Sequence, residues 1–219
     1  MRTTPDKALQ YIAELFATED DVLKTIRANA VETGAGGMQL GAVEAKILQL
    51  LMRLNNVKRV VEVGCFMGCS AMWMARALPE GGKLYTIEHN AENAAKAKTQ
   101  FQASEQKHKI HLMEGKAQKI LPTLESEAPF DMIFIDADKG GYADYLTWAE
   151  KNIRKGGLII GDNTLLFGNV YADEPDLNRV TKKAYNSMRE FNARLADENK
   201  YQSILIPTEE GMTVAIKLF

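Results

Sequence analysis

The chain has 219 residues, of which 46% are hydrophobic and 26% charged, and its formal net charge is −2 at pH 7. These values are typical of a globular protein with one sizeable α/β domain, and they exclude a disordered chain. The near-neutral charge argues against nucleic-acid binding. The sequence contains no apolar run of roughly 18 residues that could span a membrane, and its first residues lack the apolar core of a signal peptide. We therefore expect a cytoplasmic protein.

Three helices are predicted before the first strand, because apolar residues recur there at helical spacing. They span residues 5–17, 19–32 and 42–54. Thr18 and Asp21 resemble a capping box that opens the second of these helices. We interpret residues 1–54 as a helical cap within a single domain of residues 1–219. The alternative for part of this segment is that Met38 and its neighbours close over a ligand.

The stretch from residue 60 to residue 78 is predicted to form a strand, a glycine turn and a helix. Val60–Val63 is the buried strand, Gly64 and Gly68 bound the turn, and helix-forming residues follow from Ser70. Glycine lets the backbone approach a ligand, and a helix start presents unpaired N–H groups, so this pattern indicates a nucleotide-type binding site. Its spacing is G-x-x-x-G, not the G-x-G-x-x-G of dinucleotide enzymes. The alternative is a tight connection that binds nothing.

Both cysteines of the chain, Cys65 and Cys69, lie in this glycine turn. A pair of thiols can form a metal or redox site, but no further Cys or His stands at zinc spacing. We therefore interpret both as small side chains packed under the turn, in a reducing compartment.

Strands and helices alternate after the glycine turn. Strands are predicted at residues 83–87, 110–113, 131–135 and 157–160, and helices at 91–104, 117–124, 142–153 and 177–197. Two final strands, 201–207 and 212–218, are separated by a hairpin-like turn. This order predicts a Rossmann-like, doubly wound, mostly parallel seven-stranded sheet with helices on both faces. The terminal hairpin supplies one antiparallel strand.

Acidic residues fall at the carboxyl ends of the predicted strands, where ligands bind in open parallel sheets. Glu62 lies in the first strand, and Glu88 closes the second. Glu88 stands 24 positions after Gly64, close to the spacing of about 20 residues at which an acid binds ribose hydroxyls. The first two strands therefore favour an adenosyl ligand.

A second polar group follows the later strands. Asp136, Asp162 and Asn163 offer two carboxylates and a carboxamide, a hard-oxygen set that suits Mg²⁺ or Ca²⁺. Lys139 is expected beside this ion, where a cation disfavours the protonated ammonium, so the lysine can serve as a general base. The alternative for each acid is a loop or cap residue. For Lys139 the alternative is a solvated side chain or a salt bridge to Asp138.

Several longer motifs carry a resemblance to a known family. They are Gly37-Met38-Gln39, VVEVGCFMGCSA, YTIE at 85–88, EGKA at 114–117, FDMIFIDADKGGYADY at 130–145, GGLIIGDNTLLFGNV at 156–170 and the terminal EEGMTVAIK. With these motifs the chain resembles the metal-dependent, S-adenosylmethionine (SAM)-dependent O-methyltransferases, the family of catechol and caffeoyl-CoA O-methyltransferases. It looks closest to the small bacterial members.

The resemblance implies a cofactor, a metal and a role for each matching residue. The residues it assigns to SAM are Met38, Glu62, Gly64, Gly68, Ser70, Glu88, Ala117, Asp136 and Asp138. Within this set Glu88 is expected at the ribose diol, Ala117 near the adenine, Asp138 at the amino-acid part and Met38 over the pocket. The metal ligands are Asp136, Asp162 and Asn163, with Mg²⁺ expected and Ca²⁺ or Mn²⁺ as alternatives. Lys139 and Asp136 are the implied catalytic residues.

The predicted reaction is methyl transfer to a hydroxyl of a catechol-like or hydroxycinnamoyl-type aromatic, whose two oxygens chelate the ion. Residues 38–43 and 166–169 are expected to border this acceptor. The alternatives are a nicotinamide-dependent oxidoreductase, an RNA or protein methyltransferase and a non-catalytic SAM-binding module. Because Leu9, Ile12, Phe16, Val22 and Ile26 provide more apolar surface than a cap requires, we also expect a homodimer.

Overall fold

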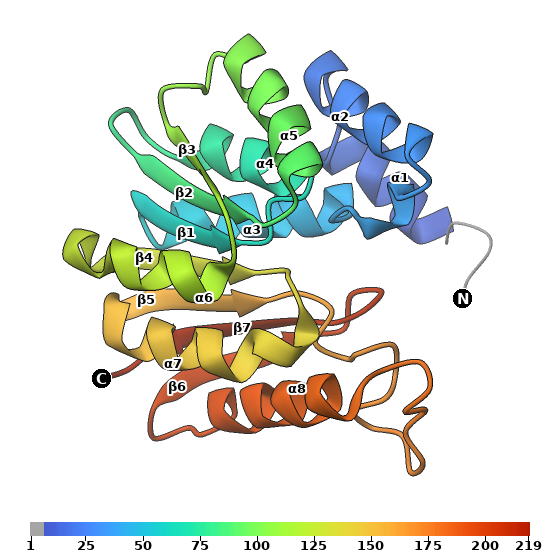
Figure 1. The fold of residues 1–219 in the computed structure, drawn as a ribbon, viewed down its shortest axis with the longest axis vertical. Coiled ribbons are helices and arrows are strands. Elements are labelled where there is room, and N and C mark those ends of the chain that lie inside the picture. The colour runs from blue at the N-terminus through green and yellow to red at the C-terminus, as the bar shows by residue number, and fades with distance from the viewer. Residues whose placement is uncertain (1–6) are drawn as a thin grey trace.

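The structure, a computed structural model, describes residues 7–219. Residues 5 and 6 of the first predicted helix lie outside the described residues. A seven-stranded sheet with the order β3-β2-β1-β4-β5-β7-β6 forms its centre (Figure 1). The strands are β1 (Arg59–Val63), β2 (Lys83–Glu88), β3 (Ile110–Glu114), β4 (Phe130–Ile135), β5 (Ile153–Gly161), β6 (Tyr201–Ile206) and β7 (Met212–Lys217).

The pairing of the strands confirms the predicted fold class. β1, β2, β3, β4 and β5 pair in parallel, whereas β7 pairs antiparallel with both β5 and β6. The C-terminal hairpin therefore inserts a single antiparallel strand, β7. Because the first five strands are parallel, the carboxyl ends of β1, β2, β4 and β5 meet at one edge of the sheet.

Helices cover both faces of the sheet. They are α1 (Lys7–Phe16), α2 (Asp21–Glu32), α3 (Ala42–Leu54), α4 (Cys69–Ala77), α5 (Ala91–Ala103), α6 (Ala117–Ile120), α7 (Tyr142–Asn152) and α8 (Lys182–Leu195), with 3₁₀ helices η1 (Gly36–Met38), η2 (Leu121–Glu127) and η3 (Lys139–Gly141). In Figure 1, α6, α7 and α8 lie along one face, and α3, α4 and α5 lie on the other. None of the helices within residues 7–219 is long and apolar enough to cross a membrane.

Alternate residues of each strand supply two apolar cores. Val60 and Ile160 pack with residues of α2, α3, α4 and α5, whereas Val61 and Ile159 pack with residues of α6, α7 and α8. Side chains of a strand alternate between the two faces of a sheet, so a run of apolar residues serves both cores. Cys65 and Cys69 are free thiols buried in the first core, as the packing interpretation predicted.

Two helix starts differ from the prediction. Asp20, not Thr18, caps α2, because its side chain accepts a hydrogen bond from Leu23 N over 3.1 Å. The predicted start at residue 177 is also wrong, since Thr181 caps α8 in the same way. Several Ser, Thr, Asp or Asn residues precede each helix, and sequence spacing alone does not show which one turns toward the free N–H groups.

Candidate active site

Lys139 lies in a cluster formed at the ends of β4 and β5. Its Nζ donates to Asp136 Oδ1 over 3.1 Å and to Asn163 Oδ1 over 2.7 Å. The lysine therefore pairs with Asp136, not with Asp138. Two of the three oxygens predicted to bind a metal converge on one cationic group, although they come from different strand ends. We call Asp136, Lys139, Asp162 and Asn163 the Lys139 cluster.

The carboxylate of Asp162 is buried without a full set of hydrogen-bond donors. Its side chain is almost fully buried, and its Oδ1 has no hydrogen-bond partner, while Oδ2 accepts from Asn163 Nδ2 over 3.4 Å. Burial and the nearby charges of Asp136 and Glu44 raise the pKa of Asp162 to about 8. Burying a carboxylate without a partner is unfavourable. A divalent cation would remove that penalty, so the cluster fits the predicted metal.

The predicted metal ligands, Asp136, Asp162 and Asn163, include only two residues of the types that most often bind metals in proteins. Within residues 7–219 no group of three or more His, Cys, Asp or Glu side chains is placed to hold a metal ion. In the predicted ligand set the third oxygen is the amide oxygen of Asn163, which is not one of these residue types. Two carboxylates and one amide oxygen are hard ligands and leave positions for other oxygen ligands, as Mg²⁺ requires.

Tyr142, which the sequence analysis did not assign to the site, lies directly under Lys139. Its hydroxyl accepts from Lys139 Nζ over 2.9 Å and lies 2.8 Å from the carbonyl oxygen of Asp162. Burial, reinforced by the charges of Asp136 and Asp162, raises the pKa of Tyr142 well above its ordinary value. The phenol therefore stays protonated and fixes the position of the ammonium. In the sequence, its position three residues after Lys139 was the only indication that Tyr142 belongs to the site.

The glycine turn packs directly against the Lys139 cluster. Gly64 has φ +99, and a Cβ there would lie 1.9 Å from the carbonyl oxygen of Asp136. Gly68 has φ +90, and a Cβ there would lie 2.5 Å from the ring of Phe101. Only glycine fits these positions, because both the space and the backbone conformation exclude a side chain. The turn predicted to bind a cofactor and the end of β4 are therefore one packed unit.

Glu62 is a fully buried acid beneath the turn. Ser70 and Thr86 both donate hydroxyl hydrogen bonds to its carboxylate. Burial raises the pKa of Glu62 to about 7, the charges of Asp136 and Glu88 add to the increase, and the two hydroxyls oppose it. Glu62 therefore changes charge near neutral pH, and Ser70 is held by it at the start of α4.

Glu88 lies at the carboxyl end of β2 and faces the same turn. Its Oε2 accepts from Phe66 N over 2.7 Å, and its Oε1 accepts from Asn90 N over 2.8 Å. Phe66 has φ +50, a conformation that non-glycine residues rarely adopt. Glu88 thus holds the turn in an unusual conformation through a charge-assisted hydrogen bond.

Asp138 belongs to a separate network next to the cluster. It accepts a hydrogen bond from the hydroxyl of Tyr145, which in turn accepts from Gln118 Nε2 over 3.0 Å. Burial and the neighbouring Asp138 raise the pKa of Tyr145 above its ordinary value. The network connects η3 with α6, where Ala117 is the first residue.

Met38 stands apart from these groups. It ends η1, and its side chain is 66% exposed. Neither Met38 nor Ala117 belongs to the Lys139 cluster. The other predicted residues form three neighbouring groups at one edge of the sheet: the glycine turn with Glu62 and Glu88, the Lys139 cluster, and Asp138 with its tyrosine.

A mostly parallel sheet of this order, with acids at its strand ends and a glycine turn after β1, is that of a Rossmann-like methyltransferase. Residues 13–218 match the O-methyltransferase family. A catechol O-methyltransferase from Niastella koreensis is 37% identical over 213 residues, 94% of each chain. Caffeoyl-CoA O-methyltransferase 2 from Populus trichocarpa is 30% identical and covers 97% of this chain and 89% of its own length.

Solved structures agree with this assignment. The O-methyltransferase TomG from Streptomyces achromogenes, in complex with SAM, is 33% identical, with a TM-score of 0.89 over 98% of this chain and 97% of its own. An O-methyltransferase from Bacillus cereus, in complex with S-adenosylhomocysteine (SAH), is 26% identical, with a TM-score of 0.85 over 96% and 97%. The chain belongs to the O-methyltransferase family, and the predicted class of enzyme, a SAM-dependent O-methyltransferase, is confirmed.

Proposed function

We propose that this protein transfers a methyl group from SAM to one hydroxyl of an aromatic acceptor with two adjacent hydroxyls, with a divalent cation held at the Lys139 cluster. The observation that carries the proposal is the convergence of Asp136 and Asn163 on one cationic centre, beside the unpartnered oxygen of Asp162. The names of two relatives, a catechol and a caffeoyl-CoA O-methyltransferase, support an acceptor of this class.

In this proposal Asp136, Asp162 and Asn163 hold the cation. When bound, it supplies positive charge that lowers the pKa of the acceptor hydroxyl and orients its oxygen. SAM supplies an electrophilic methyl group. The residues of the chain bind and orient SAM and the acceptor, and they accept one proton. Orienting reacting groups in this way can lower the activation barrier by about 7–11 kcal/mol.

Lys139 is the proposed base. If Asp136 and Asn163 held a cation, Lys139 would lose these two oxygen partners, its side chain would be free to turn toward the acceptor, and the nearby positive charge would favour the neutral amine. The neutral Nζ then accepts the proton of the acceptor hydroxyl, while the buried hydroxyl of Tyr142 limits where the amine can lie. General-base catalysis of this type contributes about 10²–10⁴-fold.

The cofactor is proposed to lie over the glycine turn. Ser70 and the N–H groups at the start of α4 face the amino-acid end, with Glu62 below them, and Glu88 faces the ribose. Ala117 then borders the adenine, Asp138 the amino-acid part, and Met38 the opening of the pocket. Support comes from the shared edge of the sheet on which these groups lie and from relatives solved with SAM or SAH.

A screen of acceptors tests this function. Labelled SAM is supplied with a catechol, a single-hydroxyl phenol, RNA and a protein extract, each with Mg²⁺ or with EDTA. We expect transfer to the catechol alone, lost in EDTA and restored by Mg²⁺. Undiminished transfer in EDTA would remove the cation from the mechanism. Labelling of RNA or protein would favour the alternative acceptors instead. Asp162→Asn, which changes a proposed ligand of the cation, should lose the Mg²⁺-dependent transfer, whereas Asp144→Asn, which changes an exposed acid of α7, should keep it.

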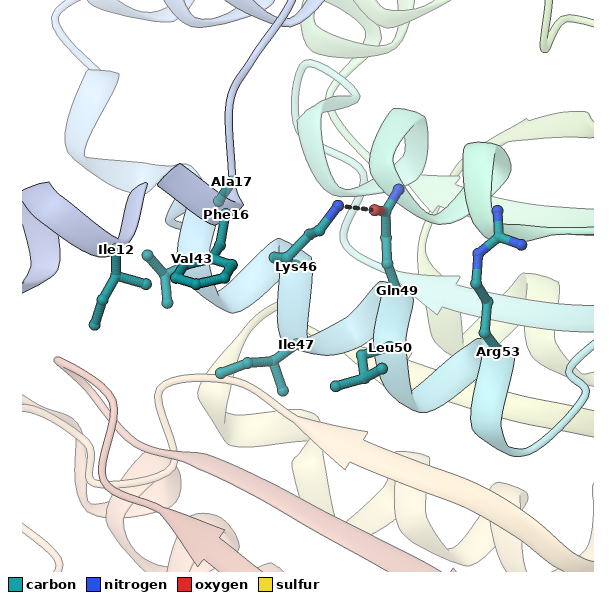
Figure 2. A pocket seen from close by; sticks show the side chains of 9 residues that line it. All are labelled: Ile12, Phe16, Ala17, Val43, Lys46, Ile47, Gln49, Leu50 and Arg53. Carbon is teal, nitrogen blue, oxygen red and sulfur yellow. Dashed lines mark hydrogen bonds between the residues drawn. The ribbon is translucent and has the colours of Figure 1, made fainter. Parts of the chain in front are cut away.

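We further propose that the protein is a homodimer built on its N-terminal helices. A groove of about 390 Å³ runs between α1 and α3. Figure 2 shows Ile12, Phe16, Val43, Ile47 and Leu50 around it. No residue of α1 is buried. A contiguous apolar surface of this kind is typical of an interface.

A cytoplasmic location stays a prediction, and the two free buried thiols, Cys65 and Cys69, fit a reducing compartment.

A further inference from the structure

The loop that follows β5 holds Asn163 in an unusual backbone conformation. Asn163, Leu166 and Phe167 all have positive φ values, +53, +50 and +54. L-residues rarely adopt this region, and such conformations persist only where the surrounding structure fixes them. Neighbouring elements must therefore hold the loop in place.

The turn between β6 and β7 holds the loop from one side. Thr164 N donates to the carbonyl oxygen of Gly211 over 2.9 Å, and Leu165 N donates to that of Glu210 over 2.9 Å. The carboxylate of Glu210 also accepts from Phe167 N over 3.1 Å. Gly211 has φ +76, and a Cβ there would lie 2.5 Å from Leu165 Cγ. The loop and the turn thus fit together closely.

A polar cluster ties the same loop to β7 and α8. Thr164 and Thr213 are buried, and Thr213 Oγ1 lies 2.8 Å from Thr164 Oγ1 and 3.0 Å from Asn192 Oδ1. Asn192 Nδ2 donates to the carbonyl oxygen of Thr164 over 2.8 Å. We call these three residues the Thr164 clamp. None of them belongs to the Lys139 cluster, yet Thr164 directly follows Asn163 in the chain.

We propose that the Thr164 clamp is a positioning device that holds the Asn163 carboxamide at the cation site, an inference that rests on the proposed function. An amide oxygen carries no net charge, so its value as a ligand depends on being held where the ion needs it. Asn163 Oδ1 already lies 2.7 Å from the Lys139 ammonium. The clamp fixes the backbone from which this side chain extends.

The test removes one hydroxyl from the clamp and measures metal affinity in the full chain. Thr213→Val keeps the shape of the side chain but loses both polar contacts, and Thr213→Ser keeps the hydroxyl. We expect Thr213→Val to weaken Mn²⁺ binding, measured by titration calorimetry, by about 10- to 100-fold. Thr213→Ser restores most of the affinity. SAH affinity changes little, because the glycine turn follows β1 and the clamp does not contain any of its residues.

Thr208→Val is the matched control. Thr208 lies in the same turn, and its Oγ1 is buried without a hydrogen-bond partner, so its hydroxyl supports nothing in the loop. This variant should bind Mn²⁺ as the wild type does. All measurements are made well below the unfolding midpoint of each variant. Thr164→Val, which deletes the other hydroxyl of the same contact, replaces Thr213→Val if that protein does not fold.

The outcomes separate the clamp from the function on which it rests. A wild-type protein that binds no Mn²⁺ would contradict the cation site itself. If Thr213→Val, or Thr164→Val where it replaces that variant, binds Mn²⁺ as tightly as the wild type does, the clamp alone is overturned. Equal losses of Mn²⁺ and SAH affinity would also overturn it, because they would indicate general loosening of the fold. Selective loss of Mn²⁺ affinity with rescue by serine supports the clamp.

Discussion

The ammonium of Lys139 donates to the carboxamide oxygen of Asn163 over 2.7 Å, although 24 residues separate them in the chain. Parallel pairing of β4 with β5 brings their carboxyl ends together, and this pairing places the two side chains within reach. The same ammonium also contacts Asp136. The lysine therefore occupies the centre to which the proposed cation would bind, and the ammonium and that cation would compete for the same oxygens.

Replacement of Lys139 tests its proposed role as the base. We expect Lys139→Ala to lower kcat at neutral pH by about 10²–10⁴-fold. SAH affinity should stay close to that of the wild type, because the lysine lies outside the glycine turn. Lys151→Ala, which changes an exposed lysine in the last turn of α7, is the control. A Lys139→Ala enzyme with nearly the wild-type kcat would exclude the lysine as the base.

Asp162→Asn should stabilise the protein in EDTA while it abolishes stabilisation by Mg²⁺. The wild-type carboxylate is buried with an unpartnered oxygen beside Asp136, which costs free energy in the absence of a cation. Above pH 8, where this carboxyl is ionised, removal of the charge relieves about 1–3 kcal/mol of this penalty. Thermal unfolding with and without Mg²⁺ measures both effects. An unchanged midpoint in EDTA would show that the buried charge costs nothing.

Much of the fold follows from local sequence patterns. The run Val60–Val63 and the glycines that follow it predicted β1 and its turn within one residue, because buried strands and tight turns have distinctive compositions. The predicted helix over residues 117–124 is correct only in part. α6 ends at Ile120, and a 3₁₀ helix with Pro122 in its first turn continues the chain. Proline lacks the N–H that an α-helix needs at this point.

The candidate site was predicted less completely than the fold. The alternation of strands and helices predicts parallel strands, whose carboxyl ends lie at one edge of the sheet. The grouping of Asp136 with Asn163 follows from this prediction, because each residue comes directly after a strand. Tyr142 and Tyr145 were missed because an aromatic residue near a helix start is more often a core residue, and its hydroxyl contacts depend on tertiary packing. The Thr164 clamp was beyond prediction for the same reason, since its members come from three separate segments.

The pKa of Glu62 predicts how stability depends on pH. Its folded pKa, about 7, lies above the ordinary glutamate value of 4.5, so the folded state holds a proton that the unfolded state releases between these values. Stability therefore falls as pH rises through this window, and the fall levels off above pH 7. In EDTA and without cofactor, Glu62→Gln should remove about 2–3 kcal/mol of this fall. Chemical denaturation at several pH values measures it.

Two variants serve as references for Glu62→Gln. Glu80→Gln changes an exposed acid in the loop between α4 and β2 and should leave the pH profile as it is in the wild type. Asp162→Asn removes a second buried acid and should flatten the profile between about pH 4 and pH 8, so its effect extends above pH 7, where that of Glu62→Gln ends. If Glu62→Gln and the wild type have parallel profiles between pH 5 and 7, Glu62 is not the titrating group.

Gly64→Ala should damage the protein far more than a typical glycine substitution. Its Cβ would meet the carbonyl oxygen of Asp136 at 1.9 Å, so the end of β4 must shift. We expect a loss of more than about 3 kcal/mol in unfolding free energy. Gly81→Ala is the control, because Gly81 also has a positive φ, +74, but nothing lies within 4 Å of its Cβ. Equal losses in both variants would show that backbone conformation alone, not the contact with Asp136, requires glycine.

The groove between α1 and α3 predicts the assembly of the protein. Phe16 and Leu50 line it, and they are 61% and 59% exposed. Phe16→Asp and Leu50→Asp place a charge where the proposed interface must exclude water, which is unfavourable unless the charge is paired. We expect a dimer for the wild type and monomers for both variants in sedimentation at micromolar concentration. Ile204→Asp, an exposed apolar residue on the edge strand β6, should stay dimeric. A monomeric wild type would refute the interface, whereas dimeric variants would place it elsewhere on the surface.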